Sequence, residues 1–325
     1  MVGAELAFTA GDLARIRFAV SPMWEVVTSY RSLRHSAVYH RPWAEQVAPR
    51  VREAGLDRGW LAALVPATGY LADFLNPTPG VAFPELAVEL DAIRGADPER
   101  VAVELGMLAA ENPLPRRLER VRPEQLAELV AVEIETYWEL ALAPYWARIR
   151  RLLEADVFHR ARQAAEHGTA HVLNELHESV SWDENSLRLV QRQCRVERGA
   201  AGAGLLLVPS AFAWPSVLTR VVPPDPPQLA YPARGIGTLW ESRSKAPAAA
   251  VAAVLGRSRA LLLTELDAPA STTELARRAG LTAAGVSQHL TALRAAGLVS
   301  AHRAGRSVLY ARTEVGNALL VPSGG

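Results

Sequence analysis

Residues 271–298 contain two short amphipathic segments separated by a single turn. Ser271 and Glu274 have the spacing of a capping box, which predicts that a helix starts there. Gly280 stands where a left-handed residue ends such a helix. Thr282 can then cap a second helix that follows at once. The segment therefore predicts two consecutive helices joined by a tight turn.

The second predicted helix has two unlike faces. Val286, Leu290 and Leu293 form its apolar stripe, and Gly297 ends it. The opposite face carries small or hydrogen-bonding side chains, and the helix contains no acidic residue. Such a face suits a helix that enters a DNA groove, because nothing on it repels phosphates and small residues permit close approach to base edges. We therefore expect the recognition helix of a helix-turn-helix, with a reading surface centred on Ser287, Gln288 and His289. The full set of predicted DNA-binding residues here is Thr272, Thr273, Ala284, Ser287, Gln288, His289, Thr291 and Arg294.

A β-hairpin with a basic tip is predicted after this helix. Residues 298–302 and 307–312 alternate as strands do, and Arg303 and Arg306 flank the glycine of the tip. A wing of this kind presents arginine to a neighbouring phosphate or minor groove. Residues 250–325 hold eight arginines and four acidic residues, whereas the whole chain has a net charge of +1. A solvated polar surface is the alternative explanation for either piece alone, but both pieces in this order favour a DNA-binding winged helix.

Four segments resemble hallmark segments of the ArsR/SmtB family of bacterial winged-helix repressors. They are Thr-Glu-Leu-Ala (273–276), Val-Ser-Gln-His-Leu (286–290), Leu-Arg-Ala-Ala-Gly-Leu-Val (293–299) and Gly-Arg-Ser-Val-Leu-Tyr (305–310). The resemblance covers the last quarter of the chain, and it implies a repressor that binds double-stranded DNA. Residues 9–18 and 231–235 more loosely resemble ArsR-type regulators with a large N-terminal domain of unknown role.

Metal-sensing members of that family place a cysteine pair on the first helix of the motif, or His and Asp on the closing helix. Residues 275–279 contain no thiol, and residues 314–320 contain one carboxylate and no histidine. We therefore expect no metal site and no cofactor. Residues 283–285, Ala-Ala-Gly, also replace the polar residues that members often have at the start of the recognition helix.

The remaining chain has the composition of an ordinary globular protein, with 325 residues, 50% hydrophobic and 21% charged. It contains no run of about 18 apolar residues and no signal-peptide pattern, so we expect a cytoplasmic protein without a membrane partner. Cys194 is the single cysteine, which excludes an intramolecular disulfide. We expect it to be buried in a strand.

Helical patterns dominate the first half of the chain. Helices are predicted at 13–20, from Pro22, from Pro42, at 56–64, 84–94 and 98–111, and from Pro123 to about Glu178 with breaks at Pro144 and Gly168. Strands are predicted at 186–190, 193–196, 205–208 and 228–231. The fold class is thus mostly α with some β, with an N-terminal α+β domain (1–241) and a C-terminal winged helix-turn-helix (242–325) joined by a polar linker at 241–247.

No catalytic constellation emerges from the front region. Residues 199–204 lack the spacing of a nucleotide-binding glycine loop, and Ser210 lacks the glycines of a nucleophile elbow. His167 and His171 are four residues apart, as zinc ligands can be, but Gly168 between them favours solvated histidines. We therefore expect no catalytic residue and no enzymatic activity.

Three tryptophans in the strand-rich part, Trp182, Trp214 and Trp240, could either line a ligand pocket or belong to the core. Taken together, the sequence predicts a transcriptional repressor of ArsR type that is controlled by a small organic effector in its N-terminal domain. A single short recognition helix makes few contacts, so we expect a homodimer on two half-sites. The alternative is an enzyme or protein-partner domain fused to a regulatory DNA-binding module.

Overall fold

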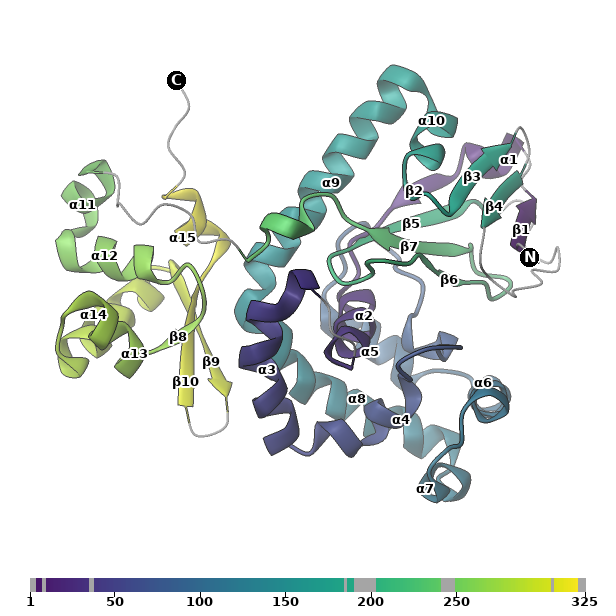
Figure 1. Ribbon diagram of the computed structural model, residues 1–325, viewed down its shortest axis with the longest axis horizontal. Helices are drawn as coiled ribbons and strands as arrows, with labels where there is room; N and C mark the ends of the chain where they lie inside the picture. The colour runs from purple at the N-terminus through teal and green to yellow at the C-terminus, as the bar shows by residue number, and fades with distance from the viewer. Residues whose placement is uncertain are drawn as a thin grey trace. The chain divides into compact units, whose positions relative to one another are not determined.

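Four strands from distant parts of the sequence form the largest sheet of the computed structural model, in the order β2-β5-β7-β6 (Figure 1). β2 (Ile16–Phe18), β5 (Leu205–Ser210) and β7 (Gln228–Pro232) are parallel, and β6 (Leu218–Arg220) is antiparallel to β7. A second, antiparallel sheet has the order β1-β4-β3, formed by β1 (Ala4–Ala7), β4 (Ser186–Leu189) and β3 (Val180–Asp183).

The structure describes residues 4–7, 10–34, 38–183, 186–189, 203–240, 249–304 and 307–320. Cys194, the strand predicted at 193–196, the linker at 241–247, the domain boundary at 241–242 and Arg306 lie outside these residues. Within them, no helix is long and apolar enough to cross a membrane.

The chain divides into two compact units that do not follow chain order. Unit 1 comprises Met1–Arg41, Arg58–Ile134 and Arg151–Gly237, and unit 2 comprises Pro42–Asp57, Glu135–Arg150 and Thr238–Gly325. Both sheets above belong to unit 1. Its helices are α1 (Ala10–Leu13), α2 (Pro22–Leu33), α4 (Trp60–Leu64), α5 (Leu86–Arg94), α6 (Pro98–Glu111), α7 (Arg116–Arg120), most of α8 (Pro123–Tyr137), most of α9 (Trp146–His167) and α10 (Thr169–Asn174).

Helix α2 begins where Ser21 and Pro22 predict it. The Ser21 hydroxyl accepts a hydrogen bond from the backbone N–H of Trp24 at 3.2 Å, and the carboxylate of Glu89 accepts from the Ser21 hydroxyl at 2.6 Å and from the Met23 N–H at 2.8 Å. Orphan donors at a helix start need such partners when they are buried. The helix is buried along most of its length, so it is a core element of unit 1.

One hydrophobic cluster joins the two sheets of unit 1 to α10. Its members are apolar side chains from α10 and from the strands, together with Val217, Leu176 and Tyr231. These side chains come from positions up to about 60 residues apart in sequence. The sheets and α10 therefore share one core, which fixes the loops that follow β5 and β7.

The helix predicted at 13–20 is wrong. Residues 16–18 form strand β2, which pairs in parallel with Leu205–Leu207. Ile16 and Phe18 pack against the hydrophobic cluster of unit 1. Branched and aromatic side chains of this kind suit a half-buried sheet surface, and the distant partner strand overrides the local helical pattern.

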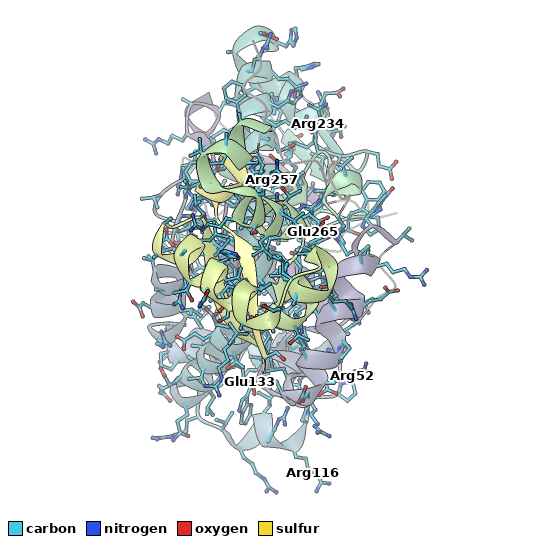
Figure 2. All side chains as sticks on the ribbon, turned by 90° about the vertical axis from the view of Figure 1, so that its left-hand side faces the viewer. Arg52, Arg116, Glu133, Arg234, Arg257 and Glu265 are labelled. Atoms are coloured by element: carbon cyan, nitrogen blue, oxygen red, sulfur yellow. The ribbon has the colours of Figure 1, made fainter. Side chains whose placement is uncertain are left out.

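The C-terminal elements of unit 2 have the order of a winged helix (Figure 1). The helices are α11 (Ala249–Leu255), α12 (Arg257–Glu265), α13 (Thr272–Ala279), α14 (Ala283–Ala295) and α15 (Glu314–Ala318). The strands are β8 (Ala270–Ser271), β9 (Val299–Ala304) and β10 (Ser307–Arg312), in the order β8-β10-β9. Figure 2 labels Arg257 and Glu265, the two ends of α12. The fold is therefore α+β and mostly helical with a C-terminal winged helix-turn-helix, as the sequence predicts.

Unit 2 also contains helical segments from the first half of the chain. They include α3 (Arg41–Glu53) from Pro42 onward, the end of α8, a π-helical turn (Trp138–Leu142), a short 3-10 turn (Ala143–Tyr145) and the first turn of α9. The indole N–H of Trp43 donates to the Ala141 carbonyl at 2.8 Å, which joins α3 to the π-helical turn. These segments pack with the winged helix in a single compact unit.

Candidate nucleic-acid interface and ligand pocket

The helix-turn-helix is held by the caps that its sequence predicts. The Ser271 hydroxyl accepts from the Glu274 N–H at 3.2 Å, and the Thr282 hydroxyl accepts from the Gly285 N–H at 3.2 Å. Gly280 ends α13 with φ of 66° and ψ of 29°, a left-handed conformation that glycine adopts without steric cost. The angle between α13 and α14 is thus fixed by local interactions.

Helix α14 separates its apolar and polar residues cleanly. Val286, Leu290 and Leu293 are buried in a cluster with side chains of α12, α13 and β9. Buried branched side chains of this kind each contribute about 1.5–3 kcal/mol relative to exposure. The opposite arc is exposed and consists of Ala284, Ser287, Gln288, Thr291 and Arg294, while His289 beside it is half-buried. We call these five exposed residues the α14 arc.

The predicted DNA-binding residues differ in whether their hydrogen-bond donors remain available to DNA. The Thr291 hydroxyl donates to the Ser287 carbonyl at 2.9 Å, so its proton is engaged within the helix and only its oxygen can accept from a partner. On α13, Thr273 is exposed and Thr272 is half-buried. The exposed amide of Gln288 and the exposed guanidinium of Arg294 are the groups of the α14 arc whose geometry allows bidentate contact with a base.

The wing forms as an antiparallel pair of β9 and β10. Arg303 is exposed and lies opposite Val308 in the register of the two strands. Because it is the last arginine before the tip, Arg303 can reach beyond the sheet. Arg306, predicted to act with it, lies outside the described residues.

Sequence reasoning missed the contacts that support the wing from within unit 2. The Nδ1 atom of His302 lies 3.6 Å from a carboxylate oxygen of Glu139, and its Nε2 lies 2.8 Å from the Ser300 hydroxyl. Burial lowers the pKa of His302, and the Glu139 carboxylate opposes that shift. The guanidinium of Arg148 donates to the Asp267 carbonyl at 3.1 Å. No local pattern links residues this far apart in sequence, so only the fold brings them together.

The three tryptophans predicted as ligand-binding do not come together. Trp182 on β3 packs against the hydrophobic cluster of unit 1. Trp240 belongs to unit 2, where its ring centroid lies 6.4 Å from that of Trp43 and 5.6 Å from that of Tyr145. Trp214 is 48% exposed and lines a pocket to which Trp182 and Trp240 do not belong.

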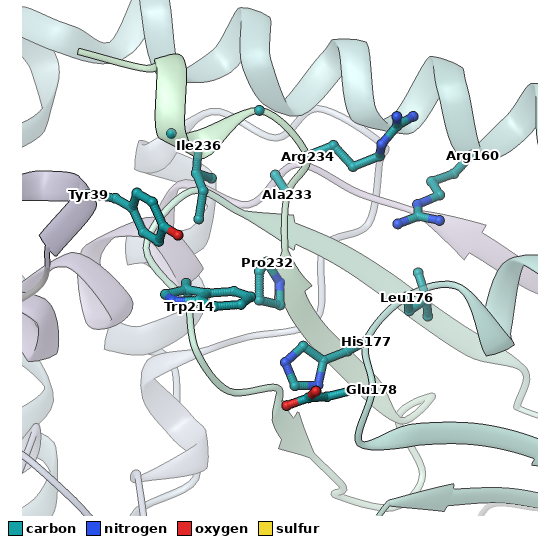
Figure 3. A pocket seen from close by; sticks show the side chains of 12 residues that line it. Tyr39, Arg160, Leu176, His177, Glu178, Trp214, Pro232, Ala233, Arg234 and Ile236 are labelled. Atoms are coloured by element: carbon teal, nitrogen blue, oxygen red, sulfur yellow. The ribbon is translucent and has the colours of Figure 1, made fainter. Parts of the chain in front are cut away.

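That pocket lies in unit 1 and has a volume of about 440 Å³, within the range of small-molecule sites (Figure 3). The last residue of β7 and the segment after it, residues 232–237, form one wall. Tyr39 and Trp214, with ring centroids 6.0 Å apart, supply aromatic surface, and Arg160 of α9 and Arg234 supply positive charge. We call this the unit 1 pocket. Sequence reasoning missed both arginines.

One titratable group that lines the pocket, His177, is already hydrogen-bonded within the fold. The Nδ1 atom of His177 accepts from the Ser179 N–H at 3.1 Å, so Nε2 carries the proton that it donates to the Pro215 carbonyl at 3.0 Å. Figure 3 shows the Glu178 carboxylate beside His177, at the opposite end of the pocket from the two arginines. His177 is thus a structural residue in the loop before β3.

A second polar cluster in unit 1 is fully enclosed. Glu25 of α2 accepts from the Ala211 N–H at 3.1 Å, and Thr28 lies 3.0 Å from the Ser210 hydroxyl. Burial raises the pKa of Glu25 to about 8, and hydrogen bonds from Ser210 and Ala211 oppose that shift. Ser210 and Glu25 have no exposed surface, so this cluster offers a substrate no access.

The paired histidines of α9 and α10 lie beside one carboxylate, since the Nε2 atom of His167 is 3.9 Å from an oxygen of Glu166. The rings of His167 and His171 have centroids 5.0 Å apart. Across the residues that the structure describes, no group of three or more His, Cys, Asp or Glu side chains is arranged to hold a metal ion.

Two segments of the chain match known protein families. Residues 255–300 match a family described as a helix-turn-helix domain, and residues 134–237 match a family of unknown function, DUF5937. All residues of the unit 1 pocket except Tyr39 lie in the second segment. No curated protein and no solved structure matched the chain significantly. The match at 255–300, together with the capped α13–α14 pair and the wing, makes the C-terminal region the helix-turn-helix domain of a DNA-binding transcriptional regulator.

Proposed function

We propose that the protein is a homodimeric transcriptional repressor whose affinity for its operator is set by a small organic effector bound in unit 1. The observation that carries this proposal is the α14 arc, a row of exposed small and hydrogen-bonding side chains without a carboxylate, backed by a buried apolar stripe. A helix with these two faces is held rigidly while its polar face remains free for a DNA groove. Repression follows if the bound operator overlaps the site used by RNA polymerase.

Dimer formation is supported by apolar surface on the helices that flank the winged helix. Val254 of α11 is 84% exposed, and Val315 of α15 is 59% exposed. Two half-sites also double the base contacts, which one helix of 13 residues does not supply in sufficient number. We expect sedimentation to give a dimer at micromolar concentration and Val254→Asp to shift it toward monomer. A parent protein that sediments only as a monomer, with and without DNA, would contradict the dimer.

The effector site is supported by the unit 1 pocket. Its volume suits a small molecule, and its walls combine aromatic and charged side chains. An effector changes DNA affinity only if it binds the two conformations of the protein with different affinity. The chain passes from unit 2 to unit 1 within α9, and Arg160 of the pocket lies on the same helix. Because one helix belongs to both units, a shift of α9 on ligand binding would extend to its first turn, which is part of unit 2.

The rival proposal is an enzyme that carries a DNA-binding module. The pocket supports a sensor better, because both ring nitrogens of His177 are occupied by protein groups and the Ser210–Glu25 cluster is closed. A catalytic base must reach its proton within hydrogen-bond distance, and neither group can do so from these positions.

Selection of genomic fragments by the purified protein tests the proposal. We expect enrichment of a few fragments that share an inverted repeat with half-sites about one helical turn apart. A reporter placed behind such a fragment should be expressed less when the protein is present. Binding without any preferred fragment would contradict a sequence-specific regulator, and increased reporter expression would contradict repression.

A further inference from the structure

Two arginines of unit 1 are equally buried but differ in how their guanidinium groups are satisfied. The Arg220 side chain is 5% exposed, and its nitrogens contact the Asp73 carbonyl at 3.0 Å, the Thr78 hydroxyl at 2.9 Å and the Asp225 carboxylate at 2.9 Å. The Arg160 side chain is 6% exposed, and one of its terminal nitrogens donates to the Gln163 side-chain oxygen at 3.1 Å, yet its Nε has no hydrogen-bond partner. A buried charged donor without a partner costs more than an ordinary lost hydrogen bond. Arg160 therefore differs from Arg220, whose three guanidinium nitrogens all have partners in the fold.

The carboxylate nearest to Arg160 is occupied by other donors. Asp156 accepts from the Tyr231 hydroxyl at 2.8 Å and from the Arg234 N–H at 3.0 Å, and it lies 4.0 Å from the Nε of Arg160, beyond hydrogen-bond range. Burial and the Asp156 charge raise the pKa of Tyr231, so its hydroxyl keeps the proton that it donates. Asp156 thus holds the segment after β7 in place and leaves the buried Nε of Arg160, a residue that lines the pocket, without an acceptor.

A second positive charge stands at the same end of the pocket. Arg234 is exposed, and Figure 3 shows its side chain and that of Arg160 on the side of the pocket formed by α9. Burial, followed by the charges of Arg234 and Arg160, lowers the pKa of the neighbouring His159. The Asp156 carboxylate opposes that shift. Two guanidinium groups against this one carboxylate leave a net positive charge at this end of the pocket, which favours an anion.

Beyond the arginines the pocket has an aromatic and apolar wall, and its far end carries His177 and the Glu178 carboxylate. The Trp214 ring stands nearly perpendicular to that of Tyr39, at an interplanar angle of 77°, and Leu176 and Ile236 also line the space. Flat apolar groups stack well on such rings, whereas a small inorganic anion would leave them uncovered.

We infer that the unit 1 pocket binds an aryl carboxylate, with the carboxylate on Arg160 and Arg234 and the ring against Trp214. Guanidinium and carboxylate groups match in planar, two-point geometry, and the carboxylate supplies an acceptor to a guanidinium whose Nε has none. The inference rests on the proposed function only for the role of this ligand as effector. The ligand class itself follows from the pocket.

Calorimetric titration of the full-length protein with benzoate, 1-naphthoate and indole-3-acetate tests the ligand class. At least one acid should bind at sub-millimolar concentration, and the neutral alcohol of the same ring should bind at least tenfold more weakly. Binding of acid and alcohol with equal affinity, or of no acid at millimolar concentration, would overturn the inference. Inorganic phosphate that competes as well as the acids would show a simple oxyanion site and would overturn it too.

Substitutions of pocket residues test where the ligand binds. Arg234→Gln should weaken acid binding roughly tenfold, and Arg160→Gln roughly tenfold to a hundredfold, because each removes a charge-assisted hydrogen bond. Arg162→Gln is the matched control, since Arg162 lies on the same helix but is 69% exposed and pairs with Glu166. Trp214→Ala should also weaken binding, whereas Phe158→Ala, an exposed ring of α9 outside the pocket, should not.

Further measurements distinguish loss of folding, a wrongly placed ligand and a ligand that does not control DNA binding. Arg160→Lys keeps the charge but loses the planar fork, so circular dichroism like that of the parent with weaker acid binding would show that folding is not the cause. Equal effects of Arg160→Gln, Arg234→Gln and Arg162→Gln would overturn the inference. Acid binding that leaves DNA affinity unchanged would contradict effector control and leave the ligand class standing.

Discussion

Helices α2 and α14 carry similar numbers of polar side chains but use them in opposite ways. In α2, Glu25, Thr28 and Ser29 are buried, and each makes a hydrogen bond inside the protein. In α14, Ser287, Gln288 and Arg294 are exposed over a buried apolar stripe. Polar groups that the fold satisfies stabilise it, whereas polar groups held rigidly at the surface are available to a partner. Substitutions in α2 should therefore change stability, and substitutions in the α14 arc should change binding.

The largest expected effect is on the pH dependence of stability through Glu25. Burial raises its pKa to about 8 from 4.5, so the folded protein holds a proton that the unfolded chain releases. Stability therefore falls as pH rises from about 5 to about 8. Glu25→Gln keeps an acceptor for the Ala211 N–H and removes the titration. Over this pH range the free energy of unfolding of the parent should fall by roughly 2–4 kcal/mol more than that of the variant.

Urea unfolding at several pH values measures this difference. Glu89, whose pKa burial raises to about 7, is present in both proteins, so its contribution cancels in the comparison. If the free energy of unfolding changes with pH in the same way for parent and variant, the pKa of Glu25 is not raised and its carboxyl group is not buried.

The next effect concerns DNA affinity. Gln288→Ala should weaken operator binding by about 1–3 kcal/mol, because a bidentate contact with a base is lost. The free energy of unfolding should change by less than about 0.5 kcal/mol, since the side chain is exposed. A variant that binds normally but unfolds more easily would reverse the roles that we assign to the two faces of α14.

The smallest effect is expected at the wing. Arg303→Ala should weaken binding to all DNA sequences about equally and lower the slope of log affinity against log salt by about 1. Arg116→Ala, on exposed α7 of unit 1, removes the same charge away from the winged helix and serves as the control. Arg306→Ala carries the same prediction as Arg303→Ala. Parent-like binding by both wing variants across a salt titration would show that the hairpin does not contact DNA.

The sequence predicts the winged helix well because its determinants are local. Ser271 and Thr282 each cap a helix through a backbone N–H three residues away, and Gly280 ends α13 at the position predicted. The apolar stripe of α14 repeats within one helix, so its buried face follows from spacing alone. Strand β8 was missed because two residues paired with β10 leave no periodic pattern.

Unit 1 could be predicted less completely because its determinants lie far apart in the chain. Residues 16–18 become a strand only because Leu205–Leu207 lie beside them. Arg160 is one of several arginines on a long helix, and nothing near it in sequence reveals that Tyr231 and Arg234 occupy Asp156. Trp214 was predicted as a ligand-binding residue and does line the pocket, whereas the places of Trp182 and Trp240 depend on packing across the fold.

Base preference at the operator tests the central claim most directly. The selected operator is altered one base pair at a time, and each version is titrated with the parent and with Ser287→Ala and Gln288→Ala. Circular dichroism confirms that both variants are folded. If the α14 arc reads the DNA, Gln288→Ala relaxes preference at one base pair of each half-site and leaves the other positions unchanged. Undiminished affinity and unchanged base preference in both variants would mean that another element reads the DNA and that α14 is only scaffold.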